Sequence, residues 1–252
     1  MFKKLLASAG IGSAKVDTIL DKDQFTPGGN VTGIVKVQGG KTDQHIDRIN
    51  LFLMAEAVHE RDDKKFYEKV KLQEYTLTDS FIINGGESKE FNFAFVLPIN
   101  TPPTIGWTKI WIQTGLDISQ SVDPKDQDYL KVKPHPYVET ILGALTKELG
   151  FYLGKVEMEY SKRHGYVQEF EFTPTSEYRS DLDELEAIFF VRDNQVNLVL
   201  QVDRRAKGLD GLFAEALETD ESHVRVSFSN NEIANGSRYI ADELRGIIKG
   251  II

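Results

Sequence analysis

Two kinds of side chain in this sequence could support catalysis or metal binding: its histidines and its clustered carboxylates. The five histidines are scattered, and none is paired at the spacing of a His-Glu-x-x-His motif: His45, His59, His135, His164 and His223. The chain has no cysteine, which excludes disulfides, thiolate metal sites and thiol nucleophiles. No Gly-x-Ser-x-Gly elbow is present, so residue order suggests no Ser-His-Asp triad. We therefore expect a non-catalytic protein without a cofactor.

Three neighbouring carboxylates, Asp123, Asp126 and Asp128, could supply oxygen ligands to a calcium ion. They lack the turn glycine and the distal glutamate of an EF-hand loop, so a weak calcium site is an alternative to a solvated loop. A second acidic run is typical of a solvated face or the start of a helix: Asp181, Asp183, Glu184 and Glu186.

The stretch FTPGGN, residues 25–30, raises two alternatives, a phosphate-binding loop and a simple turn. Pro27 presets φ for the second position of a tight turn, and Gly28 accepts the positive φ that a type II turn requires next. Alternating valines follow, whereas a phosphate loop must lead into a helix whose N-terminus faces the anion. We predict a turn between strands.

An amphipathic helix is predicted at the C-terminus, with an apolar stripe that includes Ile240, Leu244, Ile247 and Ile251. If this stripe packs on its own domain, it is core. If it is exposed, it suits a partner's groove, a second copy of the chain or a membrane surface. The polar face carries both charge signs, which argues against strong lipid binding. These four residues are our candidate partner-binding residues.

Two tryptophans, Trp107 and Trp111, support a second hypothesis, a binding module for a carbohydrate or a small apolar molecule. Exposed tryptophans stack on sugar rings. The alternative is that at least Trp111 is buried between domains.

The overall composition is that of a soluble globular protein, with 40% hydrophobic and 27% charged residues among 252. Its formal net charge of -9 makes nucleic acid an unfavourable partner. The N-terminal sequence MFKKLLASAG has too short an apolar middle for a secretory signal, and we expect a short helix there. No run approaches the roughly 20 apolar residues that span a bilayer. We expect a cytoplasmic protein.

Period-2 alternation of apolar residues recurs along the first half of the chain, as in half-buried strands. The clearest apolar faces are Val31, Val35 and Val37; Ile49, Leu51, Leu53, Ala55 and Ala57; Phe91, Phe93, Phe95 and Leu97; and Ile110, Ile112, Leu116 and Ile118. Turn-forming clusters of Gly, Asn, Asp and Pro separate them. This pattern predicts an antiparallel β-sandwich.

A polar, proline-bearing stretch, residues 123–137, is predicted to be a linker, and a helix is predicted at Tyr137–Leu149. Alternation then resumes, with a further short helix expected at 209–217. We therefore predict two β-sandwich domains, residues 1–133 and 134–252. Short helices are expected at the N-terminus, the domain junction and the C-terminus.

The motifs FTPGGNVTGIVKV, EFNFAFVLPINTPPT and KIWIQTGLDI occur in the order and spacing of the N-terminal domain of arrestin-like proteins. The whole chain resembles the bacterial sporulation-control proteins called SpoOM, through FKKLLASAGIGSAKVDT, IQTGLDI and VDRRAKGLDGLFAEAL. The resemblance implies two arrestin-like β-sandwiches and an adaptor that controls entry into sporulation through protein contacts. It further implies partners among cell-division or cytoskeletal proteins, allows a homo-oligomer, and implies no catalytic residues.

Overall fold

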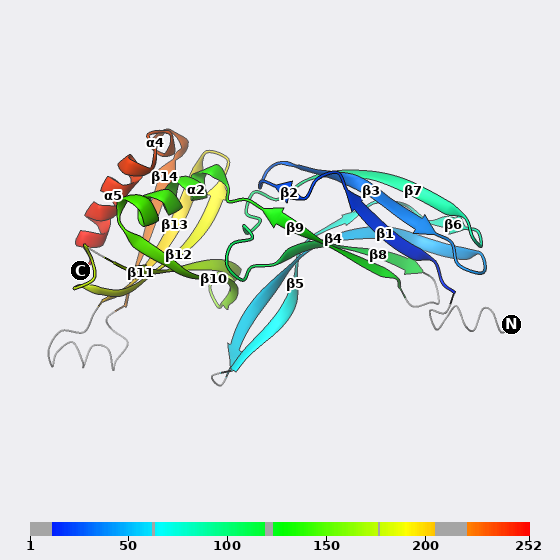
Figure 1. Cartoon of the computed structure of the whole chain (residues 1–252), viewed down its shortest axis with the longest axis horizontal. Coiled ribbons are helices and arrows are strands. Elements are labelled where there is room, and N and C mark those ends of the chain that lie inside the picture. The colour runs from blue at the N-terminus through cyan, green and yellow to red at the C-terminus, as the bar shows by residue number, and fades with distance from the viewer. Residues whose placement is uncertain (1–11, 62–63, 119–122, 176, 205–220) are drawn as a thin grey trace. The chain divides into compact units, whose positions relative to one another are not determined.

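The structure, a computed structural model, describes residues 12–61, 64–118, 123–175, 177–204 and 221–252 (Figure 1). Strands predominate among them, which confirms the mainly β fold class. The chain divides into two compact units. Unit 1 comprises Met1–Glu56, Tyr67–Thr104 and Lys109–Lys133, and unit 2 comprises Ala57–Phe66, Ile105–Thr108 and Pro134–Ile252. The helices predicted at the N-terminus and at 209–217 lie outside the described residues.

Unit 1 is a sandwich of two sheets. One sheet has the order β1-β3-β7, all antiparallel, with β1 at Lys15–Leu20, β3 at Asn30–Gln38 and β7 at Ser88–Val96. The other has the order β4-β8-β9-β2, and β5 and β6 also pair with β4. Its strands are β2 (Gln24–Phe25), β4 (Gln44–Arg61), β5 (Lys64–Thr76), β6 (Phe81–Ile83), β8 (Ile110–Ile118) and β9 (Lys125–Val132), of which β4 and β5 extend beyond unit 1.

The predicted apolar faces form the core of this sandwich. Val31, Val35 and Val37 on β3 are fully buried, as are the alternate residues of β4 from Ile49 to Ala55. Each valine, leucine or isoleucine side chain among them contributes about 1.5–3 kcal/mol of hydrophobic stabilisation. The FTPGGN turn leads directly into β3. Gly28 has φ +81°, as the predicted type II turn requires.

The linker predicted at residues 123–137 is wrong for most of its length, because β9 occupies Lys125–Val132 and pairs with β8. The inward-facing side of β9 begins with two carboxylates, Asp126 and Asp128, before Leu130 and Val132. An inward face that is half acidic shows no apolar alternation, which is why periodicity did not reveal the strand.

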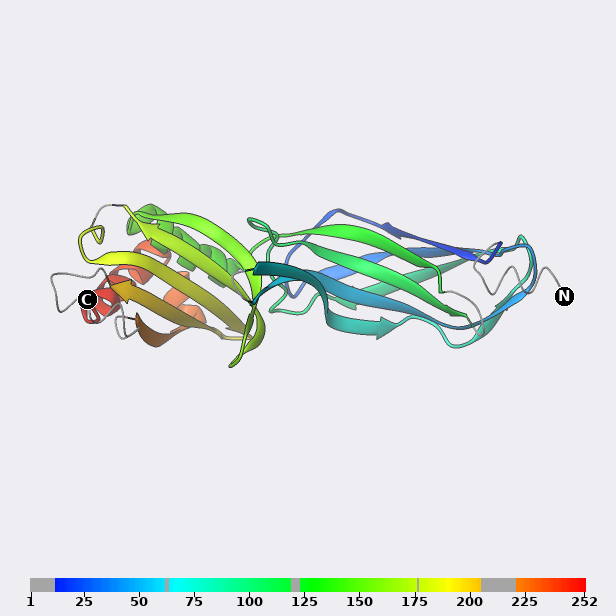
Figure 2. The same ribbon diagram turned by 90° about the horizontal axis from the view of Figure 1, so that it is seen from below.

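Unit 2 is built on an antiparallel meander in the order β10-β11-β12-β13-β14. The strands are β10 (Phe151–Ser161), β11 (Gly165–Pro174), β12 (Leu182–Arg192), β13 (Gln195–Arg204) and β14 (Glu221–Ser229). The helical elements are α2 (Pro136–Gly143), a π-helical turn η1 (Ala144–Glu148), α4 (Asn230–Ala234) and α5 (Ser237–Lys249). They lie on one face of the sheet in Figure 1, and Figure 2 shows the opposite face.

The layer that covers the inner face of this sheet is therefore helical, in place of the second sheet that the sequence predicts for this part of the chain. The predicted junction helix is present as α2 and η1. Pro136 occupies the first turn of α2, and the Nδ1 atom of His135 accepts the backbone N–H of Tyr137 at 3.2 Å to cap it. Ile141 and Leu145 are fully buried, so this segment is part of the core of unit 2.

Candidate functional site

The C-terminal stripe is largely part of the core of unit 2. Ile240 and Leu244 are fully buried, and α5 packs on α2 and η1. Ile247 and Ile251 are half-buried. The sequence left open whether the stripe is core or an exposed partner-binding surface. Ile240 and Leu244 belong to the core, because a fully buried side chain presents no surface to a partner.

The three carboxylates proposed for calcium are directed to different partners. Asp123 Oδ1 accepts the backbone N–H of Ile118 at 3.1 Å, whereas Asp126 Oδ2 accepts that of Thr18 at 2.7 Å. Among the residues that the structure describes, no group of three or more His, Asp or Glu side chains could hold a metal ion. The geometry gives the calcium alternative no support.

Asp126 and Asp128 instead form a carboxylate pair on the inner face of β9. Burial, the charge of Asp126, a hydrogen bond to Asp126 and the charge of Asp17 together raise the pKa of Asp128 to about 7. The Oδ2 atom of Asp128 is buried without a hydrogen-bond partner in the described structure. Two carboxylates so close favour one shared proton near neutral pH.

The two tryptophans differ in exposure. Trp111 is 2% exposed and lies beneath Lys69, whose Nζ atom is 5.6 Å from the ring centroid. Trp107 is 76% exposed. Because Trp111 is covered, only Trp107 is available to stack on a ligand, so the pair forms no sugar-binding platform.

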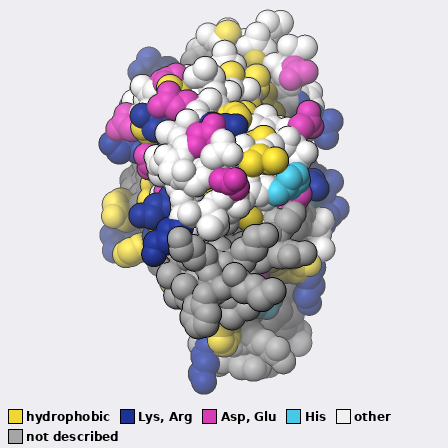
Figure 3. All heavy atoms as spheres, turned by 90° about the vertical axis from the view of Figure 1, so that its right-hand side faces the viewer, with side chains coloured by type: hydrophobic (Ala, Val, Ile, Leu, Met, Phe, Trp, Pro, Cys, Tyr) yellow, Lys and Arg dark blue, Asp and Glu magenta, His cyan; other side chains and the backbone are white. Residues whose placement is uncertain are grey.

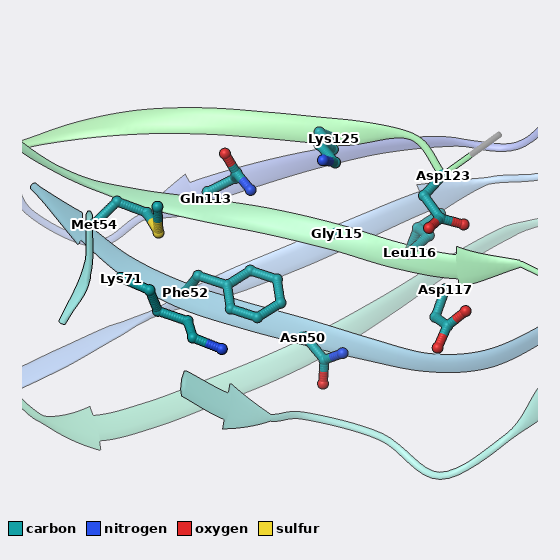
Figure 4. A pocket seen from close by; sticks show the side chains of 10 residues that line it. All are labelled: Asn50, Phe52, Met54, Lys71, Gln113, Gly115, Leu116, Asp117, Asp123 and Lys125. Carbon is teal, nitrogen blue, oxygen red and sulfur yellow. The ribbon is translucent and has the colours of Figure 1, made fainter. Parts of the chain in front are cut away.

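A groove on the outer face of the larger sheet of unit 1 is a candidate binding surface (Figure 4). It has a volume of about 360 Å³ and crosses β5, β4, β8 and the start of β9. Its lining comprises Asn50, Phe52, Met54, Lys71, Gln113, Gly115, Leu116, Asp117, Asp123 and Lys125. Sequence reasoning missed these residues because most are polar and alternate with the core residues that it followed. The available signal was the set of residues that alternate with the core residues of the predicted strands and therefore point outward.

Gly115 lies beside the Phe52 ring on the floor of the groove. A Cβ atom at Gly115 would lie 3.6 Å from that ring, in ordinary van der Waals contact. The Nζ atom of Lys71 lies 5.4 Å from the centroid of the same ring. Asn50 and Gln113 add amide groups, and register places Gln113 opposite Phe52. The groove combines an aromatic surface, amides and both charge signs, and its lining has no histidine or hydroxyl nucleophile.

Strand β5 borders this groove with a free edge. In the described part of the chain it pairs only with β4, and it has 13 residues. Lys69 and Lys71 lie over Trp111 and Phe52, so alternate side chains of β5 point to the groove face. A long strand with unpaired N–H and C=O groups can accept another strand.

Acidic and basic side chains are intermixed on the face of the molecule that Figure 3 shows. No helix within the described ranges has the length and apolar character needed to cross a bilayer. The groove and the neighbouring edge therefore remain the candidate site of unit 1.

Known proteins are similar to this chain in sequence and in fold. The family model described as SpoOM protein matches residues 2–206. The chain is 42% identical over 256 residues to the sporulation-control protein Spo0M of Bacillus subtilis strain 168, covering 100% of this chain and 97% of that protein. The crystal structure of Spo0M from Bacillus subtilis superposes with a TM-score of 0.85 at 40% identity, over 96% of this chain and 100% of that one. This chain belongs to the SpoOM family.

Proposed function

We propose that this protein controls sporulation as a non-catalytic, cytoplasmic adaptor. The name of its Bacillus subtilis relative supports the sporulation role, and the family resemblance implies contacts with cell-division or cytoskeletal proteins. Self-association remains part of the proposal, because an unpaired edge strand can also accept a second copy of the chain.

The observation that carries the proposed contact mechanism is the position of the free edge of β5 beside the groove. A partner segment that adds to β5 gains main-chain hydrogen bonds, and its alternate side chains point toward the groove. Lys69 and Lys71 flank that path, and Lys71 already forms an ion pair with Glu74, so an acidic side chain on the segment is favoured opposite Lys69.

The test is complementation together with cross-linking. A Bacillus subtilis strain without its Spo0M relative would express this chain with a photo-cross-linker at Gln73, an exposed residue of β5. Restored spore counts and a reproducible protein adduct are expected. A matched cross-linker at Asp79, exposed but outside β5, should give no such adduct. Spore counts that stay unrestored, or adducts that are identical at both positions, would contradict the proposal.

A second candidate function is binding of a carbohydrate in the same groove. The Phe52 ring beside the amides of Asn50 and Gln113 is an arrangement that recognises sugar rings and hydroxyls. Saturation-transfer NMR with a panel of oligosaccharides tests this function. Transfer that disappears in Phe52→Ser would support it.

A further inference from the structure

The outer face of the sheet in unit 2, opposite the helices, is turned to the viewer in Figure 2. This face contains a hollow of about 450 Å³. It crosses β11, β12, β13 and β14, and the hairpin between β10 and β11 bounds it through His164, whose ring lies 5.1 Å from that of Phe190. All its lining residues belong to unit 2.

The strand register aligns four of these residues in one row across the sheet. Glu169 on β11 lies opposite Ile188 on β12, which lies opposite Val199 on β13, which lies opposite Arg225 on β14. The row therefore has a carboxylate at one end, two aliphatic side chains in the middle and a guanidinium at the other end. The next row places Gln201 and His223 beside Val199 and Arg225.

The acidic end of the row has more carboxylates than cations. Lys155 Nζ contacts Glu157 and Glu159 at 2.6 Å each and Glu171 at 3.9 Å, and Lys65 Nζ contacts Glu157 at 2.9 Å. Both lysines are thus engaged by other carboxylates. Within the described residues no cation forms an ion pair with Glu169, which is half-buried. Its burial and the neighbouring carboxylates raise its pKa, and the charge of Lys155 offsets this only in part. A ligand cation at this point would supply the direct ion pair that Glu169 lacks within the described residues.

The basic end has the opposite character. Arg225 is exposed, and no carboxylate of the described chain forms an ion pair with it. His223 lies two residues away on the same face of β14. This end suits an anionic group of a ligand, and the Ile188 and Val199 side chains suit an apolar group between the two charges.

The spacing of the row fixes the spacing of the ligand's charges. Neighbouring strands lie about 4.8 Å apart, so three intervals place Glu169 and Arg225 about 14 Å apart at the backbone. An extended peptide advances about 3.4 Å per residue, so four residues cover nearly the same distance. Residues i, i+2 and i+4 of such a peptide also point to the same side.

We propose that this hollow binds an extended segment of a partner protein with the pattern basic-x-apolar-x-acidic. Glu169 receives the basic side chain, Ile188 and Val199 receive the apolar one, and Arg225 receives the acidic one. This inference rests on the proposed function, since it takes the ligand to be a protein, but it uses a surface of unit 2 that is separate from the groove of unit 1.

The test uses the full chain labelled with 15N and two capped peptides of equal composition, Lys-Ala-Leu-Ala-Glu and Lys-Ala-Leu-Glu-Ala. The second peptide places its charges three residues apart, on opposite sides of an extended strand. The first should bind at least tenfold more tightly, with shifts centred on β11 to β14. Glu169→Gln and Arg225→Gln should each weaken it about threefold to tenfold. Glu243→Gln and Arg238→Gln, exposed on α5, should not.

A charge reversal gives a second and sharper readout. Arg225→Glu should reverse the preference, so that Lys-Ala-Leu-Ala-Lys binds more tightly than Lys-Ala-Leu-Ala-Glu. Absence of binding at millimolar peptide, equal affinity for both spacings, or an unchanged preference in Arg225→Glu would overturn the inference. If any of these results occurs while the cross-linker at Gln73 still gives its protein adduct, the inference fails and the proposed function stands. If the adduct at Gln73 is lost while the peptide still binds, the proposed mechanism at the groove of unit 1 fails and the inference stands.

Discussion

The backbone N–H of Thr18 donates to Asp126 Oδ2 at 2.7 Å, and this bond joins β1 of one sheet of unit 1 to β9 of the other. The Thr18 hydroxyl also lies 2.6 Å from that of Thr114, a fully buried residue of β8. The interior of the sandwich therefore holds a polar cluster in place of continuous apolar packing. Asp128, beside Asp126, makes this cluster sensitive to pH.

We predict that the stability of the protein falls between about pH 4 and pH 7. In this range the unfolded state has released the proton of Asp128, whereas the folded state, with a pKa raised to about 7, retains it. Above pH 7 Asp128 is ionised in the folded state as well, so the stability stops falling. Asp128→Asn should therefore be more stable than the wild type at pH 8, by about 1–2 kcal/mol after allowance for solvent screening at this half-exposed group.

Urea unfolding from pH 4 to pH 8 checks this prediction, with Asp79→Asn as the exposed control. The free energy of unfolding of Asp128→Asn should still fall somewhat with rising pH. The reason is that burial and a hydrogen bond to Glu171 help to raise the pKa of Glu184 in unit 2 to about 7 as well. A variant less stable than the wild type at pH 8 would contradict the prediction.

Truncation of the C-terminal stripe should destabilise unit 2. Leu244→Ala removes a fully buried side chain and should lower the free energy of unfolding by about 2–5 kcal/mol. The control is Arg238→Ala, because that side chain is 87% exposed. Denaturant unfolding monitored by circular dichroism measures both. Equal stability of Leu244→Ala and the wild type would show that the stripe is not core.

Substitution of two glycines by alanine should change the stability of the protein in opposite directions. A Cβ atom at Gly33 would lie 2.4 Å from the carbonyl oxygen of Ile19 and 2.8 Å from the Phe93 ring, so Gly33→Ala must push β1 or β7 away and should destabilise unit 1. Gly246 lies within α5 with no atom within 4 Å of its added Cβ. Gly246→Ala should therefore stabilise the protein by about 0.5–1 kcal/mol. Thermal unfolding compares them, and a stabilising Gly33→Ala would refute the steric argument.

The contribution of the buried Glu157 to the stability of unit 2 should depend on the two lysines that pair with it. Glu157 is 5% exposed, and although burial raises its pKa, the hydrogen bonds from Lys155 and Lys65 lower it overall. Its contribution to stability is present above the pKa of the unfolded carboxyl and is lost as the pH falls into the acid range. Lys155→Met leaves Glu157 with one cation and should cost about 1–3 kcal/mol at pH 7.

The control for this pair is Lys162→Met, at an exposed position of the hairpin after β10. The difference between Lys155→Met and the wild type should shrink only as the pH falls below the ordinary glutamate pKa of about 4.3, because the lowered pKa keeps Glu157 ionised down to that range. A difference that stays constant with pH would indicate lost packing of the lysine stem rather than lost charge.

Much of the fold could be predicted from the sequence because most strands have one apolar face. The valines of β3 and the aliphatic residues of β4 repeat every second residue, and this period is a property of the extended chain itself. The Pro27-Gly28 turn was predictable for the same local reason, since φ +81° requires a residue such as glycine. Strand β9 was not, because its inward face begins with Asp126 and Asp128 and so lacks apolar alternation, and the partner of Asp126, Thr18, is distant in the sequence.

By itself, then, the sequence determined what depends on the nearest few residues: the mainly β class, the turns, the junction helix at α2 and the SpoOM resemblance. Only the tertiary structure decided which side chains meet. It placed Ile240 and Leu244 in the core, brought Thr18 to Asp126, and aligned Glu169 with Arg225 across four strands. Strand register and burial are set by contacts between distant segments, and no local pattern of residues specifies them.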